Sequence, residues 1–178
     1  MFQPTPVQVN AIFGMIAAYI RDRRDQFFPE ARAVSSREMA VLEPFFGRAR
    51  LTRARIYQLE KSEFPNPAFY PTLREMGFHD LPDFSHMAAI TFVDAIVFRE
   101  RVTMPVLFHE LVHVVQYDLL GADRFAELYV RGFLSGGGYE GIPLEKNAYE
   151  LDSRFSRKPS QVFDVESVVR EWNATEQF

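Results

Sequence analysis

The chain has 178 residues, the length of one compact domain, and its 47% hydrophobic and 25% charged residues are ordinary for a globular protein. Its formal net charge of −4 lacks the basic excess of nucleic-acid-binding proteins, so we expect no nucleic acid partner. The absence of cysteine excludes disulfides, thiolate zinc sites and a cysteine nucleophile.

The apolar stretch of residues 7–20 lacks the features of an export signal or a membrane span. No lysine or arginine precedes it, it contains Gln8 and Asn10, and the charged residues 21–24 follow it directly. A signal peptide places its positive charges first, and a membrane span needs about 20 predominantly apolar residues. The sequence therefore predicts a soluble, cytoplasmic protein with no membrane partner.

The N-terminal half predicts two helices and a strand. The Thr5-Pro6 pair has the pattern of an N-cap followed by proline at the first helical position, and apolar residues recur at helical spacing to about residue 25. A shorter helix is expected from Ser36 to about residues 44–47, and a strand within residues 53–60.

Two further stretches of this half show little regular pattern. Four arginines lie between residues 48 and 55, and we interpret them as a solvated face. Residues 61–86 contain four prolines, which predicts that they are mostly loop.

The C-terminal half begins with a short apolar, β-rich segment and continues as a series of helices. Ala89–Val93 and Ala95–Phe98 predict two strands, or one strand with a bend at Asp94. A long helix is expected from about Thr103 to Leu120, with Gly121 as its C-terminal stop.

Three more helices complete the pattern. We expect one around residues 125–133, one from Pro143 whose apolar stripe contains Leu144 and Ala148, and a terminal one within residues 160–172. Helices, a small sheet and further helices in this order predict a single α+β domain over residues 1–178.

The chemistry-bearing motif is His109-Glu110-Leu111-Val112-His113, inside the predicted long helix. Residues four apart lie on one face of a helix, one turn apart, so both imidazoles can bind the same metal ion. Glu110 projects to the side of the pair, where it can act as a base toward a water molecule at that ion. The surrounding helix is apolar around most of its circumference and should be buried, and buried polar groups need a partner. The alternative is a plain core in which hydrogen bonds satisfy both histidines.

Three segments together resemble a known family. Phe108–Gln116, FHELVHVVQ, resembles the active-site helix of zincin metallopeptidases, and Ala89–Phe98 resembles the strand that lies over their cleft. Glu145–Tyr149 resembles the second metal helix of small gluzincins, in which a glutamate followed three residues later by alanine is the third ligand. The resemblance covers residues 88–155 and departs from the family pattern at Tyr149.

The resemblance implies a minimal zincin-like domain, with a small antiparallel or mixed sheet packed against the active-site helix. It implies a zinc ion held by His109, His113 and Glu145, with Glu110 as the catalytic base.

Helical geometry also favours Glu145 as third ligand, because it lies beside the apolar stripe of its helix, where it could reach a cleft. Glu150 lies on the opposite flank and should face solvent, and Asp152 is a further candidate. A third histidine ligand after the motif is excluded, because no histidine follows His113.

Four other residues could serve the site. Tyr139 and Tyr149 could donate a hydrogen bond to a developing oxyanion or could simply pack. His79 and His86 are expected at the surface, with lining of the cleft as the alternative.

The sequence thus predicts a zinc-dependent peptidase whose peptide or protein substrate pairs with the edge of the 89–98 strands. The alternative is a catalytically inactive zincin-like binding or regulatory module. A deformylase is set aside because its third ligand is a cysteine, which this chain lacks.

Overall fold

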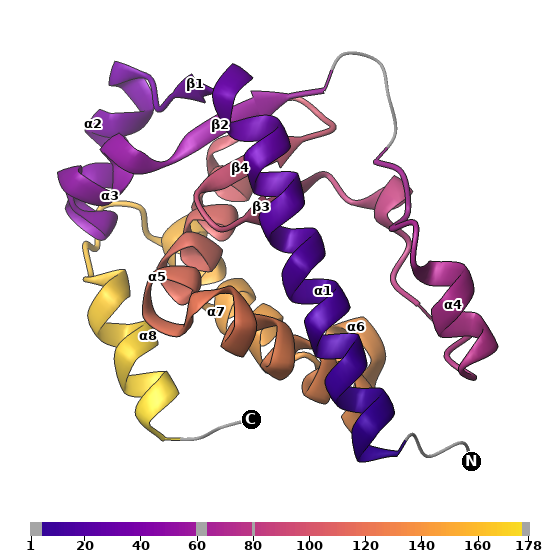
Figure 1. Ribbon diagram of the computed structural model, residues 1–178. Helices are drawn as coiled ribbons and strands as arrows, with labels where there is room; N and C mark the ends of the chain where they lie inside the picture. Colours follow the sequence, from indigo (N-terminus) through magenta and orange to yellow (C-terminus); the bar gives the residue numbers. More distant parts are fainter. Residues whose placement is uncertain (1–4, 60–63, 80, 176–178) are drawn as a thin grey trace.

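The computed structural model describes residues 5–59, 64–79 and 81–175 and has helices on both sides of a small sheet (Figure 1). The strands are β1 (Arg32–Ala33), β2 (Arg55–Gln58), β3 (Ala89–Phe92) and β4 (Ala95–Phe98). The α-helices are α1 (Pro6–Phe27), α2 (Ser36–Phe46), α3 (Arg48–Arg53), α4 (Tyr70–Glu75), α5 (Met104–Gly132), α6 (Gly138–Gly141), α7 (Pro143–Arg157) and α8 (Val165–Ala174). Short 3₁₀ turns occupy Phe28–Glu30 and Phe84–His86, and a π-helical turn occupies Phe133–Gly137.

The first two helices begin where their capping residues dictate. The Thr5 hydroxyl accepts a hydrogen bond from the backbone nitrogen of Gln8, and the Gln8 side chain accepts one from the backbone nitrogen of Thr5. Ser35 and Glu38 form the same reciprocal pair at the start of α2. Each pair satisfies two backbone donors that a helix leaves unpaired at its start. The predicted starts of α1 at Pro6 and α2 at Ser36 are confirmed.

The four strands form one mixed sheet in the order β1-β2-β4-β3. Strands β2 and β4 are parallel, and the other two pairs are antiparallel. Strands β3 and β4 form a hairpin, so the prediction of two strands rather than one bent strand is confirmed. Because β3 pairs only with β4 in this sheet, it is an edge strand.

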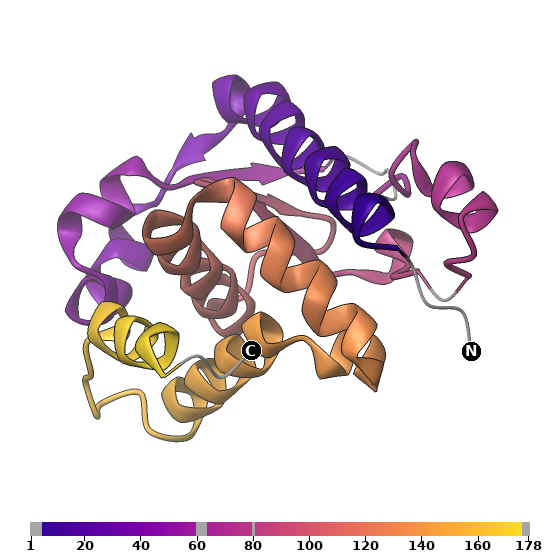
Figure 2. The ribbon, with the colours of Figure 1, turned by 60° about the horizontal axis from the view of Figure 1, so that its bottom comes forward.

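Helices cover both faces of the sheet, as Figure 2 shows. Ile96 and Phe98 of β4 belong to the core that contains the first half of α5, whereas Val97 between them packs with Tyr19 and Phe27 of α1. Successive side chains of a strand point to opposite faces, which explains this division. A strand covered on both sides is apolar throughout, and every residue of β4 is buried. The predicted α+β class is confirmed.

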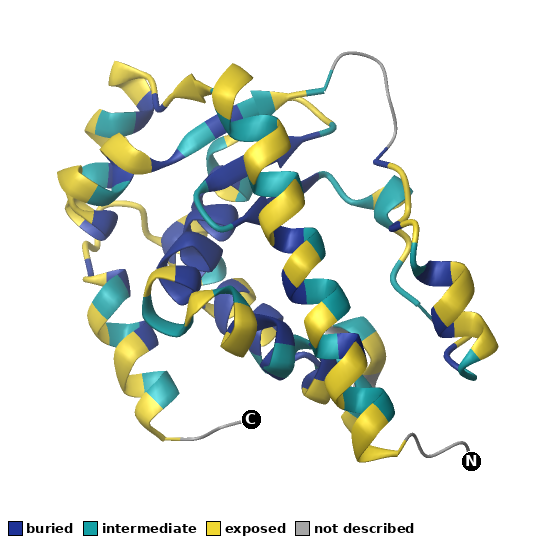
Figure 3. Cartoon of the chain, in the orientation of Figure 1, coloured by how far each residue is buried: buried dark blue, intermediate teal, exposed yellow. Residues whose placement is uncertain are grey.

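Helix α5 is interrupted at Gly121, where the backbone has φ 71° and ψ 166°. This conformation is almost restricted to glycine. The predicted helix end at Gly121 and the separate helix near residues 125–133 are therefore both present, on either side of the kink. The first half of α5 and the inward side of α7 carry many of the buried residues (Figure 3).

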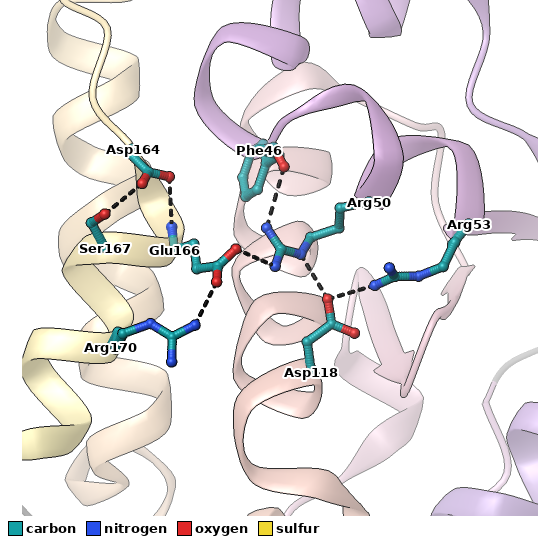
Figure 4. Close-up of polar contacts among 8 residues, drawn as sticks. All are labelled: Phe46, Arg50, Arg53, Asp118, Asp164, Glu166, Ser167 and Arg170. Atoms are coloured by element: carbon teal, nitrogen blue, oxygen red, sulfur yellow. Dashed lines mark hydrogen bonds and ion pairs between the residues drawn. The ribbon is translucent and has the colours of Figure 1, made fainter.

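A polar network joins α3, α5 and α8 (Figure 4). Arg50 donates hydrogen bonds to Asp118, to Glu166 and to the carbonyl oxygen of Phe46, at 2.7, 2.9 and 3.2 Å. Only 11% of the Arg50 side chain is exposed. The interpretation of the arginine stretch as a solvated face is therefore wrong for Arg50, because two carboxylates from distant segments cover it.

Other segments differ from the prediction in extent. Helix α4 lies within the stretch expected to be loop, where residues 60–63 and 80 fall outside the described part of the chain. The predicted strand at 53–60 extends over Arg55–Gln58, and the terminal helix begins after Asp164, which caps it. Among the helices described, none is long and apolar enough to span a membrane.

Candidate metal centre

The motif on α5 lies in the interior of the molecule. His109, Glu110 and His113 are 8%, 6% and 5% exposed, although all three are polar. They sit in the straight part of the helix before Gly121, and neighbouring residues such as Leu111 are fully buried. The predicted burial of this helix is confirmed, and the polar side chains on it need partners.

Helix α7 brings Glu145 to the two histidines. Nε2 of His109 lies 3.1 Å from Nε2 of His113, and Oε2 of Glu145 lies 3.4 and 3.5 Å from these two nitrogens. The three atoms form a nearly equilateral triangle. Glu145 itself is 5% exposed.

This triangle has the dimensions of three ligands on one small cation. Zinc binds imidazole nitrogen at about 2.0–2.1 Å, and a tetrahedral angle then separates two ligand atoms by roughly 3.3 Å. The buried Oε2 of Glu145 accepts no hydrogen bond from any residue described. A buried carboxylate oxygen without a donor is costly unless a cation binds it. The His109, His113 and Glu145 triad could therefore hold a metal ion.

Asp152, also on α7, fixes the orientation of the His109 ring. Its Oδ2 lies 2.9 Å from Nδ1 of His109. Because an ionised carboxylate only accepts hydrogen bonds, Nδ1 carries a proton, and Nε2 is the nitrogen that faces Glu145. Asp152 was considered as a ligand, and the structure instead places it behind His109.

Gln116 does the same for His113. Its Nε2 donates to the carbonyl oxygen of Leu144 and to Oδ1 of Asn147, both at 3.0 Å. Its Oε1 is therefore the atom that accepts the proton of His113 Nδ1, at 2.8 Å. Both Nε2 atoms thus face the same point, where a shared cation could replace a proton between them.

Charge interactions keep Glu145 ionised. Burial by itself raises the pKa of this carboxyl. The interactions with His113 and His109 lower the pKa by more than burial raises it, so it lies below its ordinary value. For His109, burial lowers the pKa, and the carboxylates of Asp152 and Glu145 outweigh burial and raise it to about 10. Without a metal ion these shifts favour a protonated imidazole paired with the ionised Glu145 carboxylate. A cation bound by the triad would take the place of that proton.

Glu110 is held apart from the triad by the sheet. Thr91, on the edge strand β3, donates its hydroxyl to Oε2 of Glu110 at 2.7 Å and contacts the Glu110 carbonyl oxygen at 3.1 Å. The Tyr117 hydroxyl donates to the Thr91 carbonyl oxygen at 3.4 Å. One carboxylate oxygen of Glu110 thus has a fixed partner, and the side chain stays next to the metal-ligand atoms rather than among them.

The close approach of α5 and α7 depends on Gly132. A Cβ atom at this position would lie 2.4 Å from Cδ of Pro143, the first residue of α7. Only glycine leaves room for this contact. Because Glu145 lies two residues after Pro143, the contact also fixes where Glu145 meets the motif.

A cleft of about 550 Å³ gives access to the site from the side of His109. Tyr139 and Tyr149 line it, and the Tyr149 ring packs on the His109 ring with centroids 4.6 Å apart. His86 also lines it, with Nδ1 2.9 Å from Oδ2 of Asp83, whereas His79 is exposed outside this lining. Glu150 is exposed, as expected from its flank of α7.

Sequence reasoning missed Thr91, Gln116 and Asn147. Gln116 ends the quoted motif segment and could have been noticed, because an amide three residues after a buried histidine can reach it on a helix. Nothing local marks Thr91 or Asn147, whose roles depend on the packing of β3 and α7 against α5.

The arrangement is consistent with a zincin-like site. Comparisons with models of protein families, with curated proteins and with solved structures found no match to this chain.

Proposed function

We propose that this protein is a zinc-dependent peptidase. The observation that carries the proposal is the triangle of three ligand atoms, 3.1 to 3.5 Å apart, with a glutamate held beside it and not in it. A structural site needs the ligands alone. The adjacent carboxylate of Glu110 supports a hydrolytic site instead.

The donor set supports zinc as the metal. Two imidazole nitrogens and one carboxylate oxygen are ligands that zinc accepts in tetrahedral sites. The group of candidate ligands found in the described residues has three members, His109, His113 and Glu145. Catalytic zinc sites have three protein ligands and keep a fourth position open, whereas structural sites are filled by four.

In this proposal, the metal ion, Glu110 and Thr91 have different roles in hydrolysis. When bound, zinc supplies the Lewis acid that polarises a peptide carbonyl and lowers the pKa of a water molecule. Glu110 would accept a proton from a water molecule while the water oxygen attacks the carbonyl carbon. Glu110 would then donate this proton to the leaving amine nitrogen. Thr91 keeps the Glu110 side chain in place during both transfers.

The substrate would lie along the edge strand β3. Ala89, the first residue of β3, lines the cleft together with His109 and Glu110. An extended peptide can add to such an edge through main-chain hydrogen bonds. Tyr149 is 51% exposed and packs on His109, and we assign it to the donation of a hydrogen bond to the oxygen that develops negative charge.

The substitution Glu110→Gln tests the mechanism. The amide keeps the size of the side chain and cannot accept the proton, so we expect normal zinc content and a loss of hydrolysis of about 10²- to 10⁴-fold. Zinc would be measured in the purified protein by metal analysis, and hydrolysis with unfolded casein and quenched fluorescent peptides.

Two comparisons make the result decisive. His113→Ala should lose both zinc and hydrolysis, which separates the role of a ligand from that of a base. Unchanged turnover in Glu110→Gln would remove the mechanism. Stoichiometric zinc in the native chain without cleavage of any of these substrates would favour the inactive binding or regulatory module.

A further inference from the structure

A second cavity reaches the metal-ligand triad from the side of His113. It has a volume of about 130 Å³ and is bounded by α1, α4, β3 and the second half of α5. Its walls include Ile16, Tyr70, Phe92, Phe125 and Val130. We propose that this cavity receives one large apolar side chain, of the size of phenylalanine or leucine, from the substrate residue next to the cleaved bond. This inference rests on the proposed peptidase function.

The cavity is apolar away from its mouth. Of the described residues that line it, only Glu110, His113 and Glu145 carry side chains that ionise near neutral pH, and all three belong to the site itself. Two tyrosines in the walls have partners for their hydroxyls, because Tyr70 donates to the Pro82 carbonyl oxygen at 2.8 Å and Tyr117 donates to Thr91. A charged side chain entering this cavity would lose its water and meet walls that are mostly apolar.

The volume sets the size of the occupant. An apolar cavity of about 150 Å³ in another protein stays dry and admits benzene. A cavity of about 130 Å³ therefore suits one aromatic ring or a branched aliphatic group. It is too small for a fatty-acyl chain, which argues against a lipid amide as the substrate.

The cavity and the cleft meet at the proposed base. Both are lined by Met87, Ala89, Glu110 and Tyr139. A peptide whose main chain lies in the cleft along β3 can therefore direct one side chain past Glu110 into the cavity. Since side chains of an extended peptide alternate in direction, its neighbours would point away from the cavity.

The first test measures binding and needs no turnover. Acetohydroxamic acid and phenylacetohydroxamic acid carry the same zinc-binding group and differ by one phenyl ring. Titration calorimetry with the zinc-loaded protein should give an affinity about 10- to 100-fold higher for the phenyl compound. Equal affinities would overturn the apolar pocket and leave the metal site standing. Binding of neither compound would overturn the pocket together with the proposed function.

The second test fills the cavity from opposite walls. Ile16→Phe on α1 and Val130→Phe on α5 each place a ring in the space, and both should reduce the preference for the phenyl compound to about 3-fold or less. Val168→Phe adds the same ring to a partly buried site on α8 that does not line the cavity, and it should keep the preference. Zinc content confirms that each variant is folded.

The same variants connect the pocket to catalysis. In quenched peptides that differ at one position beside the cleaved bond, the native chain should show a kcat/KM for phenylalanine about 10- to 100-fold above that for alanine. Loss of this ratio in both filled variants, with retention in Val168→Phe, is the expected result. Retention of the ratio in the filled variants would show that the side chain binds elsewhere and overturn the inference.

Discussion

At the scale of single residues, the amide of Gln116 decides which nitrogen of His113 faces Glu145. The amide nitrogen of Gln116 donates hydrogen bonds to the Leu144 carbonyl oxygen and to Asn147. Its amide oxygen therefore accepts the hydrogen bond from Nδ1 of His113. Partners of this kind orient metal-binding histidines and raise metal affinity, although they never touch the ion. Gln116 is fully buried, and its side chain also links α5 to α7 through Leu144 and Asn147.

The substitution Gln116→Leu should therefore weaken zinc binding by about 10- to 100-fold. Leucine is similar in size but leaves the His113 ring free to turn and to change its tautomer. The dissociation constant would be measured by competition with a chromophoric chelator. Gln161→Leu, at an exposed position, is the matched control and should bind zinc like the native chain. Equal affinities in both variants would show that Gln116 only fills space.

The residues of the site differ in how far the sequence reveals them. His109, Glu110 and His113 are visible because one helix places them, and the period of the helix is known in advance. Glu145 needed a second helix and its apolar stripe, which the sequence also supplies. Thr91 could not be assigned, because its contact with Glu110 depends on how β3 lies against α5.

At the scale of elements, the end of the straight part of α5 depends on Gly121. Its φ of 71° and ψ of 166° would cost a residue with a side chain about 1–3 kcal/mol, although a Cβ there would meet no other atom. Gly121→Ala should thus lower the free energy of unfolding by about this amount, as measured by denaturant titration.

Gly14 provides the opposite case within the same chain. It lies inside α1, and a Cβ there would also meet nothing within 4 Å. Because its backbone is helical, Gly14→Ala should raise the free energy of unfolding by about 0.5–1 kcal/mol. If the two substitutions had effects of the same sign, backbone conformation would not be the cause.

The elements that the sequence predicted are those with local signals, including the short apolar strands β2, β3 and β4. Helices α1 and α2 have capping boxes, and α5 and α7 have apolar periodicity. Several other short elements, β1 and α4 among them, were not predicted. Strand β1 has two residues, both exposed, and forms only because β2 lies beside it. Helix α4 is six residues long and is stabilised by the burial of Tyr70 and Leu73. No local sequence pattern predicts this burial.

At the scale of the whole molecule, the ligands come from only two helices, and the rest of the fold holds these helices together. The sheet and α1 both pack against α5, and the Arg50 network joins α5 to α3 and α8. Helix α7 closes on α5 through the contact of Gly132 with Pro143. A metal ion bound by His109, His113 and Glu145 would therefore join α5 to α7 through ligands at positions 113 and 145, which are 32 positions apart in the sequence.

This arrangement links metal binding to the stability of the entire fold. A ligand that binds only the folded chain stabilises it by about 4 kcal/mol when its free concentration is 1,000 times its dissociation constant. For a domain of this size, each kcal/mol raises the melting temperature by roughly 2–4 °C. Zinc added to the metal-free protein should therefore raise the melting temperature by about 8–16 °C, and a chelator should reverse the change.

Calorimetry on three proteins would check this prediction. The native chain and His79→Ala, which alters an exposed histidine outside the cleft, should both show the rise. In His113→Ala the triad loses one of its three ligand atoms, so zinc should raise the melting temperature little or not at all. An equal rise in all three proteins would mean that zinc stabilises the fold from another place, since His79 and His113 differ in whether they face the buried carboxylate of Glu145.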